Sequence, residues 1–126
     1  MANILIIDDD PVFSDMTKQR LERAGHHVAL HIGPFGATAV ACDPSLDLII
    51  IDVFMPGLSG PDVLGVMRKN ARVRAPVIFC SSMDDAPLRQ LAKEHGAIGH
   101  ISKSTERAEF VETVGRVLAR ARRAAL

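Results

Sequence analysis

The sequence contains four short apolar runs, and each run ends at residues that carry carboxylate, hydroxyl or ammonium groups. The runs lie at residues 4–7, 48–51, 77–80 and 98–101. Apolar runs of this length are typical of strands buried on both faces of a parallel sheet. The carboxyl ends of such strands share one edge, where open α/β sheets bind ligands. The pattern therefore predicts one pocket that contains Asp8, Asp9, Asp52, Ser81 and Lys103.

Helical periodicity alternates with these runs, and residues 27–32 alternate as a further strand. The helices are expected at about residues 11–24, 37–42, 60–69, 86–95 and 105–123. Pro11 and Pro61 occupy early helical positions, and Gly25 and Gly96 follow helices where C-terminal caps are common. Because right-handed crossovers place helices on both sides of a parallel sheet, we expect a single α/β domain over residues 1–126.

The composition narrows the classes of function. With 48% apolar and 24% charged residues, the chain is an ordinary globular protein, and no apolar stretch reaches the roughly 18 residues that a membrane span needs. Cys42 and Cys80 lack metal-ligand spacing, so a reducing, cytoplasmic compartment is expected. Fifteen basic and fifteen acidic residues give no global field to attract nucleic acid. Any charge-based function must therefore be local.

Four segments surround the ends of the predicted strands: IIDDDP at 6–11, DVFMPGLSG at 52–60, PVIFCSS at 76–82 and GAIGHISKS at 96–104. In their order and spacing, these segments together resemble the receiver domain of two-component response regulators. The resemblance covers essentially the whole chain. It implies a flavodoxin-like, doubly wound sheet of five parallel strands in the order 2-1-3-4-5, with five helices. It also implies a signalling switch that accepts a phosphoryl group from a histidine kinase or a phosphotransfer protein and that catalyses only its own phosphorylation and dephosphorylation.

The resemblance assigns roles to the strand-end residues. Asp52 would be the phosphoacceptor, because an ionised carboxylate is a competent nucleophile. Asp8, Asp9, Asp52 and the backbone carbonyl of Phe54 would hold Mg²⁺ (or Mn²⁺), a hard cation that takes oxygen ligands. Lys103 would contact a phosphoryl oxygen as a point charge. Asp10, by contrast, is expected to cap the first helix rather than bind the metal.

Other positions would govern the switch. Ser81 would bond a phosphoryl oxygen and so repack the last two strands and their helices, while Ser82 is small enough to leave its N–H accessible. His100 occupies the position where the family usually has an aromatic residue that follows the activation state. It would either move with activation or remain a plain exposed residue. Ser104 occupies the position of a family proline with a cis bond, which leaves the Lys103–Ser104 geometry open.

Two bulky apolar residues occupy positions that tune the phosphoryl lifetime in the family. Phe54 lies two residues after the acceptor, and Met83 lies two residues after the switch hydroxyl. The hypothesis is that they obstruct the attacking water and lengthen the lifetime. The alternative is that both simply cover the edge of the core.

The chain ends directly after its last predicted helix, so we expect it to act through protein contacts rather than through an output domain. The face of the fourth helix, fifth strand and fifth helix is the expected output surface. The first helix around Pro11 to Asp15, with the loop after Asp52, is the expected kinase-docking surface. Arg116, Arg120, Arg122 and Arg123 would complement the dipole of the last helix or meet an acidic partner. The downstream protein is unknown, and the chain would be a monomer or a phosphorylation-dependent dimer.

The same residues also have interpretations other than a phosphorylation-dependent switch. Taken singly, the acidic triplet would be an ordinary cap, Asp52 a turn residue and Lys103 a surface lysine. A pseudo-receiver that keeps the residues but signals without phosphorylation is the main alternative. A flavin or nucleotide binder is disfavoured because the loops lack a Gly-rich phosphate cradle and the chain has no Trp or Tyr. A phosphatase with an aspartyl nucleophile would need a substrate-covering cap that this length does not supply.

Overall fold

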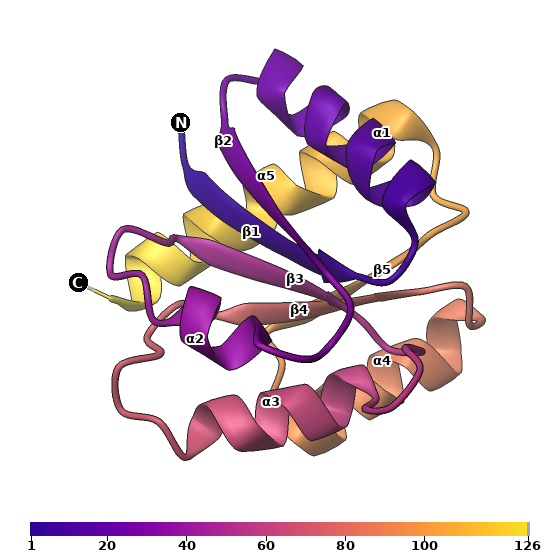
Figure 1. Ribbon diagram of the computed structural model, residues 1–126. Coiled ribbons are helices and arrows are strands. Elements are labelled where there is room, and N and C mark those ends of the chain that lie inside the picture. The colour runs from indigo at the N-terminus through magenta and orange to yellow at the C-terminus, as the bar shows by residue number, and fades with distance from the viewer. Residues whose placement is uncertain (126) are drawn as a thin grey trace.

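The computed structural model describes residues 1–125, in which five strands alternate with five helices (Figure 1). The strands are β1 (Asn3–Asp8), β2 (His27–Ile32), β3 (Leu48–Asp52), β4 (Val77–Ser81) and β5 (Gly99–Ser102). The helices are α1 (Pro11–Arg23), α2 (Ala37–Ala41), α3 (Gly60–Arg68), α4 (Asp85–His95) and α5 (Arg107–Ala124). Across this described part of the chain, every helix is too short or too polar to cross a bilayer.

All five strands are parallel and lie in the order β2-β1-β3-β4-β5, which confirms the predicted topology. β1, β3 and β4 are buried almost throughout, as their apolar runs predict, whereas the edge strand β2 is mostly open to solvent. The register pairs Asp52 with Cys80 and Ser81 with Ser102. The polar ends of β3, β4 and β5 therefore lie at the same edge of the sheet.

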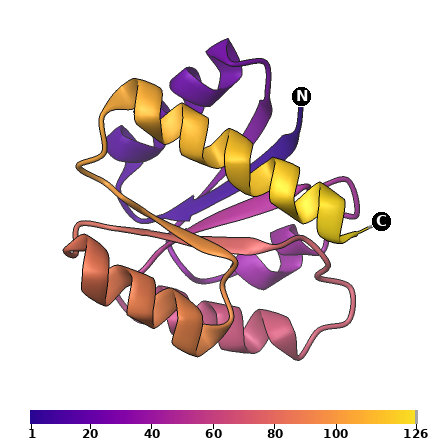
Figure 2. The same ribbon diagram turned by 180° about the vertical axis from the view of Figure 1, so that it is seen from behind.

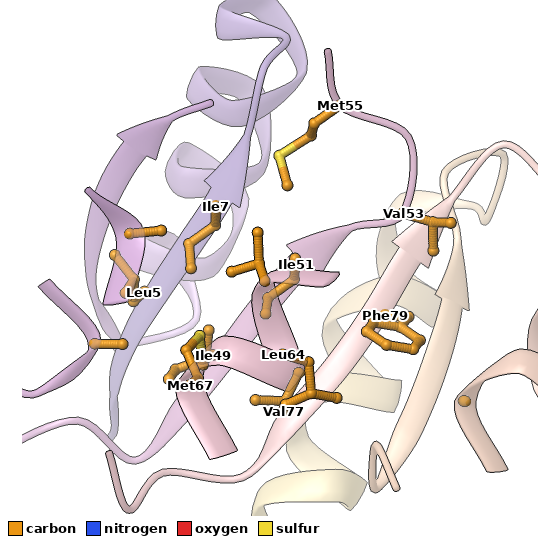
Figure 3. Packing of buried hydrophobic residues seen from close by; sticks show 14 of the residues in the cluster. Leu5, Ile7, Ile49, Ile51, Val53, Met55, Leu64, Met67, Val77 and Phe79 are labelled. Carbon is orange, nitrogen blue, oxygen red and sulfur yellow. The ribbon is translucent and has the colours of Figure 1, made fainter. Parts of the chain in front are cut away.

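Alternate residues of the buried strands supply two separate cores. Leu5, Ile7, Ile49, Ile51 and Phe79 pack on the face that α2, α3 and α4 cover (Figure 3). Their neighbours in sequence point the other way, toward α1 and α5. In Figure 1, α1 and α5 accordingly lie on one side of the sheet and the other three helices on the opposite side. Burial on both faces holds the central strands rigidly, and with them the residues at their carboxyl ends.

Helix boundaries follow the capping residues. Asp10 is the predicted cap of α1, and its carboxylate accepts hydrogen bonds from the N–H groups of Val12 and Phe13. The last helix begins at Arg107 rather than at the predicted residue 105. The reason is that the Glu106 carboxylate accepts from the N–H groups two and three residues later and so acts as the N-cap. The other predicted boundaries differ from the observed ones by one or two residues, and such differences are common at fraying ends.

Candidate functional site

Three carboxylates meet at the carboxyl edge of the sheet. Asp8 ends β1 and Asp52 ends β3, and these residues are only 1% and 4% exposed. Asp9 follows β1 and is more exposed. Each of the three residues offers an oxygen within 4.8 Å of the other two. Hard oxygen donors at this spacing fit a divalent cation such as Mg²⁺, and a cation would also offset the mutual repulsion of the carboxylates.

Lys103 brings a positive charge into this cluster. Its Nζ lies 2.9 Å from Asp8 Oδ2 and 3.4 Å from Asp52 Oδ2. The loop after β5 holds it there, because the N–H of Lys103 donates to the carbonyl of Ser81 at 2.8 Å. Burial alone would lower the pKa of Lys103, but its hydrogen bond to Asp8 and the charge of Asp52 outweigh burial and raise it. The ammonium group is therefore held in its charged form.

Phe13 completes the surroundings of this lysine. The ammonium nitrogen lies 4.6 Å from the centre of the Phe13 ring, within range of a cation–π contact. The same ring meets Phe110 of α5 edge to face. From the sequence, Phe13 is simply a member of the apolar stripe of α1. Its contact with Lys103 was not predictable because no local motif marks it.

Asp52 is the carboxyl group whose acidity the site changes most clearly. Burial and the neighbouring charge of Asp8 raise its pKa from 3.8 to about 7, against the opposing effect of Lys103. The N–H of Phe54 also approaches Asp52 Oδ1 at 3.4 Å. In the absence of a metal, the cluster thus favours a protonated Asp52 below neutral pH. A bound cation would favour the ionised form.

The hydroxyl of Ser81 is fully buried and engaged within its own turn. Its Oγ accepts a hydrogen bond from the N–H of Met83 at 3.1 Å. Ser82, between them, is exposed. The hydroxyl proton remains available to a further acceptor because Ser81 acts as the acceptor in this bond.

His100 makes a contact that the sequence did not predict. Its Nε2 lies 3.0 Å from Oδ1 of Asp85, the first residue of α4. The side chain of His100 is 22% exposed, so it is neither buried nor a plain surface residue. Nothing in the sequence pairs these two residues, which are 15 positions apart. The contact links β5 to the start of α4.

The family follows from a comparison of the whole chain with known proteins. A profile of the response regulator receiver domain matches residues 4–115. The chain belongs to the response regulator receiver family. Receiver domains are signalling switches that work through phosphorylation, and the family binds Mg²⁺ in an acidic pocket.

Full-length and partial relatives both align with this receiver. Protein PilH of Pseudomonas aeruginosa is 31% identical over 120 residues, which cover 94% of this chain and 99% of PilH. The transcriptional regulatory protein CpxR of Escherichia coli is 31% identical over 121 residues, but these cover 95% of this chain and 50% of CpxR. The chain thus spans about half the length of the curated transcriptional regulators it matches.

Solved structures confirm the fold of the receiver. The chemotaxis protein CheY4 of Vibrio cholerae is 27% identical with a TM-score of 0.82, over 93% of this chain and 98% of CheY4. A CheY-like receiver protein of Methanospirillum hungatei has a TM-score of 0.85 at 23% identity, over 98% of both chains. The flavodoxin-like topology expected from the sequence is therefore that of the receiver family.

Phe54 and Met83, the two positions expected to tune the phosphoryl lifetime, differ in burial. Phe54 is 60% exposed, so it does not cover the core edge as the alternative explanation required. Met83 is partly buried and packs against the core beneath α3 and α4. Covering of the core edge therefore accounts for Met83 but not for Phe54.

The serine after the lysine takes part in a small hydrogen-bond turn. All peptide bonds of residues 1–125 are trans, including the one between Lys103 and Ser104. The N–H of Ser104 donates to Ser102 Oγ at 3.2 Å, and the two hydroxyls lie 2.8 Å apart. Hydrogen bonds between Ser102 and Ser104 therefore hold the turn that carries Lys103.

Gly60 and Gly57 fix the loop that follows Asp52. A β-carbon on Gly60 would overlap the backbone carbonyl of Asp52, because α3 begins directly against the end of β3. Gly57 has a φ of +92°, and the Phe35 ring occupies the space where its β-carbon would lie. Sequence reasoning found neither contact. The sequence predicted Gly60 as the start of a helix and Gly57 as part of a loop, but the contacts depend on the positions of β3 and the β2–α2 loop.

Proposed function

We propose that this receiver is a phosphorylation-dependent signalling switch that accepts a phosphoryl group on Asp52 from a histidine kinase or a phosphotransfer protein. The observation that carries the proposal is the buried cluster at the sheet edge, where Lys103 contacts both Asp8 and Asp52. A half-buried lysine shared by two buried carboxylates suits a site that must accommodate additional negative charge. An ordinary helix cap or turn does not require a lysine that contacts two carboxylates.

The proposed chemistry is the transfer of a phosphoryl group to Asp52. A carboxylate oxygen of Asp52 attacks the phosphorus of the donor phosphohistidine, and the bond from phosphorus to the donor nitrogen breaks. The oxygens of Asp8, Asp9 and Asp52, with the backbone carbonyl of Phe54, would hold Mg²⁺. The bound ion would neutralise charge on the carboxylates and on the transferred oxygens. Lys103 would then contact a phosphoryl oxygen.

Ser81 is the residue that we propose couples phosphorylation to a conformational change. Its hydroxyl now accepts from Met83, and donation to a phosphoryl oxygen would draw the β4–α4 loop toward Asp52. Ser82 would offer its backbone N–H to the same group. Because His100 on β5 contacts Asp85 at the start of α4, movement of that loop would alter this contact as well. The affected elements form the proposed output face of α4, β5 and α5.

The donor protein would dock around the mouth of the acidic pocket. Val12 on α1 and Phe54 in the loop after β3 are large apolar residues that are 67% and 60% exposed. Exposed apolar residues beside a charged pocket suit a protein contact. These residues lie on the docking surface expected from the sequence, the start of α1 with the loop after Asp52.

Intact-mass measurement after incubation with acetyl phosphate and Mg²⁺ tests the proposal. The wild type should gain one phosphoryl group, and Asp52→Ala should gain none. Asp15→Ala is the matched control, because Asp15 is an exposed carboxylate on α1 outside the cluster. Chelation of Mg²⁺ should abolish labelling of the wild type. A wild type that stays unlabelled would support the pseudo-receiver alternative instead.

A further inference from the structure

The side chain of Phe13 is held in place through its backbone and through its ring. Its N–H donates to the carboxylate of Asp10, the N-cap of α1, at 3.1 Å. Its ring meets the Phe110 ring of α5 edge to face, with 6.4 Å between the centroids and 69° between the planes. Phe110 in turn belongs to the buried core on this side of the sheet. The ring of Phe13 therefore has a defined position and orientation.

The start of α5, the helix α1 and the loop after β5 come together at one corner of the molecule. Figure 2 shows the orange first turns of α5 beside the purple helix α1, with the loop from β5 leading up to them. Lys103 is the first residue of that loop. The lysine and the ring thus reach each other from separate elements.

The face of the Phe13 ring meets the ammonium group of this lysine. Lys103 Nζ lies over the ring, 4.6 Å from its centre. An aromatic ring has negative potential on its faces, so it attracts a cation placed there. The same nitrogen lies 2.9 Å from Asp8 and 3.4 Å from Asp52. An ammonium group has three N–H donors, and it has three partners here, one each from β1, β3 and α1.

Phe13 differs from the aromatic residues that serve only the core. Phe79 and Phe110 are 0% and 1% exposed, whereas Phe13 is only partly buried. Phe13 packs against the core with Phe110 and also contacts a charged group. Packing alone accounts for the first contact but not for the second.

The three partners of the ammonium group would behave differently during phosphorylation. Asp52 would become the acceptor and Asp8 would bind Mg²⁺, so both would share their oxygens with other groups. The Phe13 ring carries no charge and would bind neither the ion nor the phosphoryl group. It is therefore the partner that would remain available to Lys103 throughout the reaction.

We propose that Phe13 is a positioning residue for phosphoryl transfer, which holds the ammonium group of Lys103 beside Asp52 through the face of its ring. The role rests on the proposed function, in which Lys103 contacts a phosphoryl oxygen. Phe13 would act through the lysine rather than on the phosphoryl group itself. Without the ring, the flexible four-carbon stem of the lysine would sample other orientations, and fewer molecules would have the ammonium group in place for the transfer.

The rate of labelling by acetyl phosphate and Mg²⁺ tests the role of the ring. Phe13→Leu keeps an apolar side chain but removes the ring, and it should slow labelling by about fivefold or more. Phe13→Tyr keeps the ring and should label within about twofold of wild type. Difluoro- and trifluorophenylalanine at position 13 keep the shape of the ring but weaken the negative potential of its face. They should slow labelling progressively, and they keep the test valid if Phe13→Leu fails to fold.

Phe79→Leu is the matched control. It removes a buried ring from the opposite core, where Phe79 meets His95 edge to face at a centroid distance of 6.4 Å. All variants are compared under conditions in which urea unfolding shows them to be folded, and Phe79→Leu should then label like wild type. Equal slowing in Phe79→Leu, or equal rates across the fluorinated rings, would overturn the proposal.

NMR of Lys103 tests the contact without any phosphodonor. Its ε-protons are next to Nζ, so the ring current of Phe13 should shift them upfield of those of Lys18, Lys69 and Lys93 in a chain labelled with ¹³C-lysine. Phe13→Leu should remove the shift and Phe13→Tyr should retain it. The shift should also persist when Mg²⁺ is added. Its absence from the wild type, or its loss on addition of Mg²⁺, would overturn the proposal.

The two measurements separate this inference from the proposed function. If Asp52 is labelled but Phe13→Leu labels at the wild-type rate, the positioning role fails and the switch proposal stands. If the wild type is never labelled, the switch proposal fails, and the ring-current shift alone decides whether Phe13 holds the lysine.

Discussion

The acidic pocket at the sheet edge and the basic groove between α4, β5 and α5 carry opposite charges in a chain of zero formal net charge. In the pocket, Asp8 and Asp52 are buried, and Lys103 Nζ lies 2.9 Å from Asp8 and 3.4 Å from Asp52. In the groove, Lys93 and Arg123 are exposed, and their side chains make no hydrogen bond or ion pair within residues 1–125. Burial makes each pocket residue depend on its neighbours, whereas exposed charges act nearly independently. Substitutions should therefore have large, specific effects in the pocket and small, additive effects in the groove.

The largest difference should appear when a single methyl group is added beside the pocket. Gly60→Ala places a β-carbon against the backbone carbonyl of Asp52, which cannot move aside without displacing the end of β3. We expect a loss of about 3 kcal/mol in the free energy of unfolding. Urea denaturation measures it.

Two other glycines provide matched comparisons. Gly65, in the same helix, has open space around its position, so Gly65→Ala should stabilise the chain by about 1 kcal/mol. In the groove, a β-carbon on Gly99 would lie 3.3 Å from side-chain methyl carbons of Ile78 and Val117, which can shift. Gly99→Ala should therefore cost less than Gly60→Ala. Equal costs at positions 60 and 99 would contradict the contrast between the two regions.

The carboxyl group of Asp52 should destabilise the metal-free fold. Its pKa is raised from 3.8 to about 7, so the folded chain retains a proton that the unfolded chain releases. The resulting penalty is absent below about pH 4, grows as the pH rises toward 7 and is complete above that. Asp52→Asn should thus raise the free energy of unfolding by about 2 kcal/mol at pH 8.

Urea unfolding with a chelator, at pH 4 and at pH 8, checks this pH dependence. The gain from Asp52→Asn should vanish at the lower pH. Added Mg²⁺ should also shrink it at pH 8, since the ion stabilises the wild type more than the variant. A variant that is less stable than wild type at pH 8 without metal would contradict the expected electrostatics.

The rim of the pocket should set the lifetime of the phosphoryl group. Phe54 is exposed beside Asp52 and Met83 lies beside Ser81, so both would obstruct a water molecule approaching the acceptor. Replacing them by Asn and Glu should speed autodephosphorylation by about tenfold, which corresponds to about 1.4 kcal/mol. The decay of labelled protein, followed by intact mass, measures the rate. Val66→Asn is the control, because Val66 is an exposed apolar residue of α3 outside the loop after Asp52. An unchanged rate in the double variant would exclude the lifetime hypothesis.

The sequence predicted most of the pocket because the ends of buried strands can be recognised where apolar runs stop. The apolar runs marked β1, β3 and β4, and parallel topology then brought Asp8 and Asp52 to one edge. Asp10 was recognised as a helix cap because the proline after it marks a helix start. These inferences needed only local patterns and one rule of topology.

Contacts between side chains of different elements were not predictable in the same way. The rings of Phe13 and Phe35 are ordinary apolar residues in the sequence, yet one contacts Lys103 and the other packs on Gly57. The sequence indicated the arginines of α5 but not the groove, because Arg89 and Lys93 come from α4 on the other side of β5. Such contacts depend on helix rotation and loop path, which hydrophobic periodicity does not specify.

The smallest expected effect concerns the contact that joins the two regions. His100 lines the groove, and its ring nitrogen lies 3.0 Å from Asp85, whose side chain is 61% exposed. Because Asp85 is largely solvated, a double-mutant cycle with His100→Gln and Asp85→Asn should give a coupling of only about 0.5 kcal/mol. Arg89, the other partner of Asp85, provides the control cycle, and its longer contact of 3.5 Å should couple still more weakly. A coupling to His100 no larger than that to Arg89 would mean that β5 and α4 are not joined through this histidine in solution. The pocket and the groove would then have to communicate through the backbone of the β4–α4 loop instead.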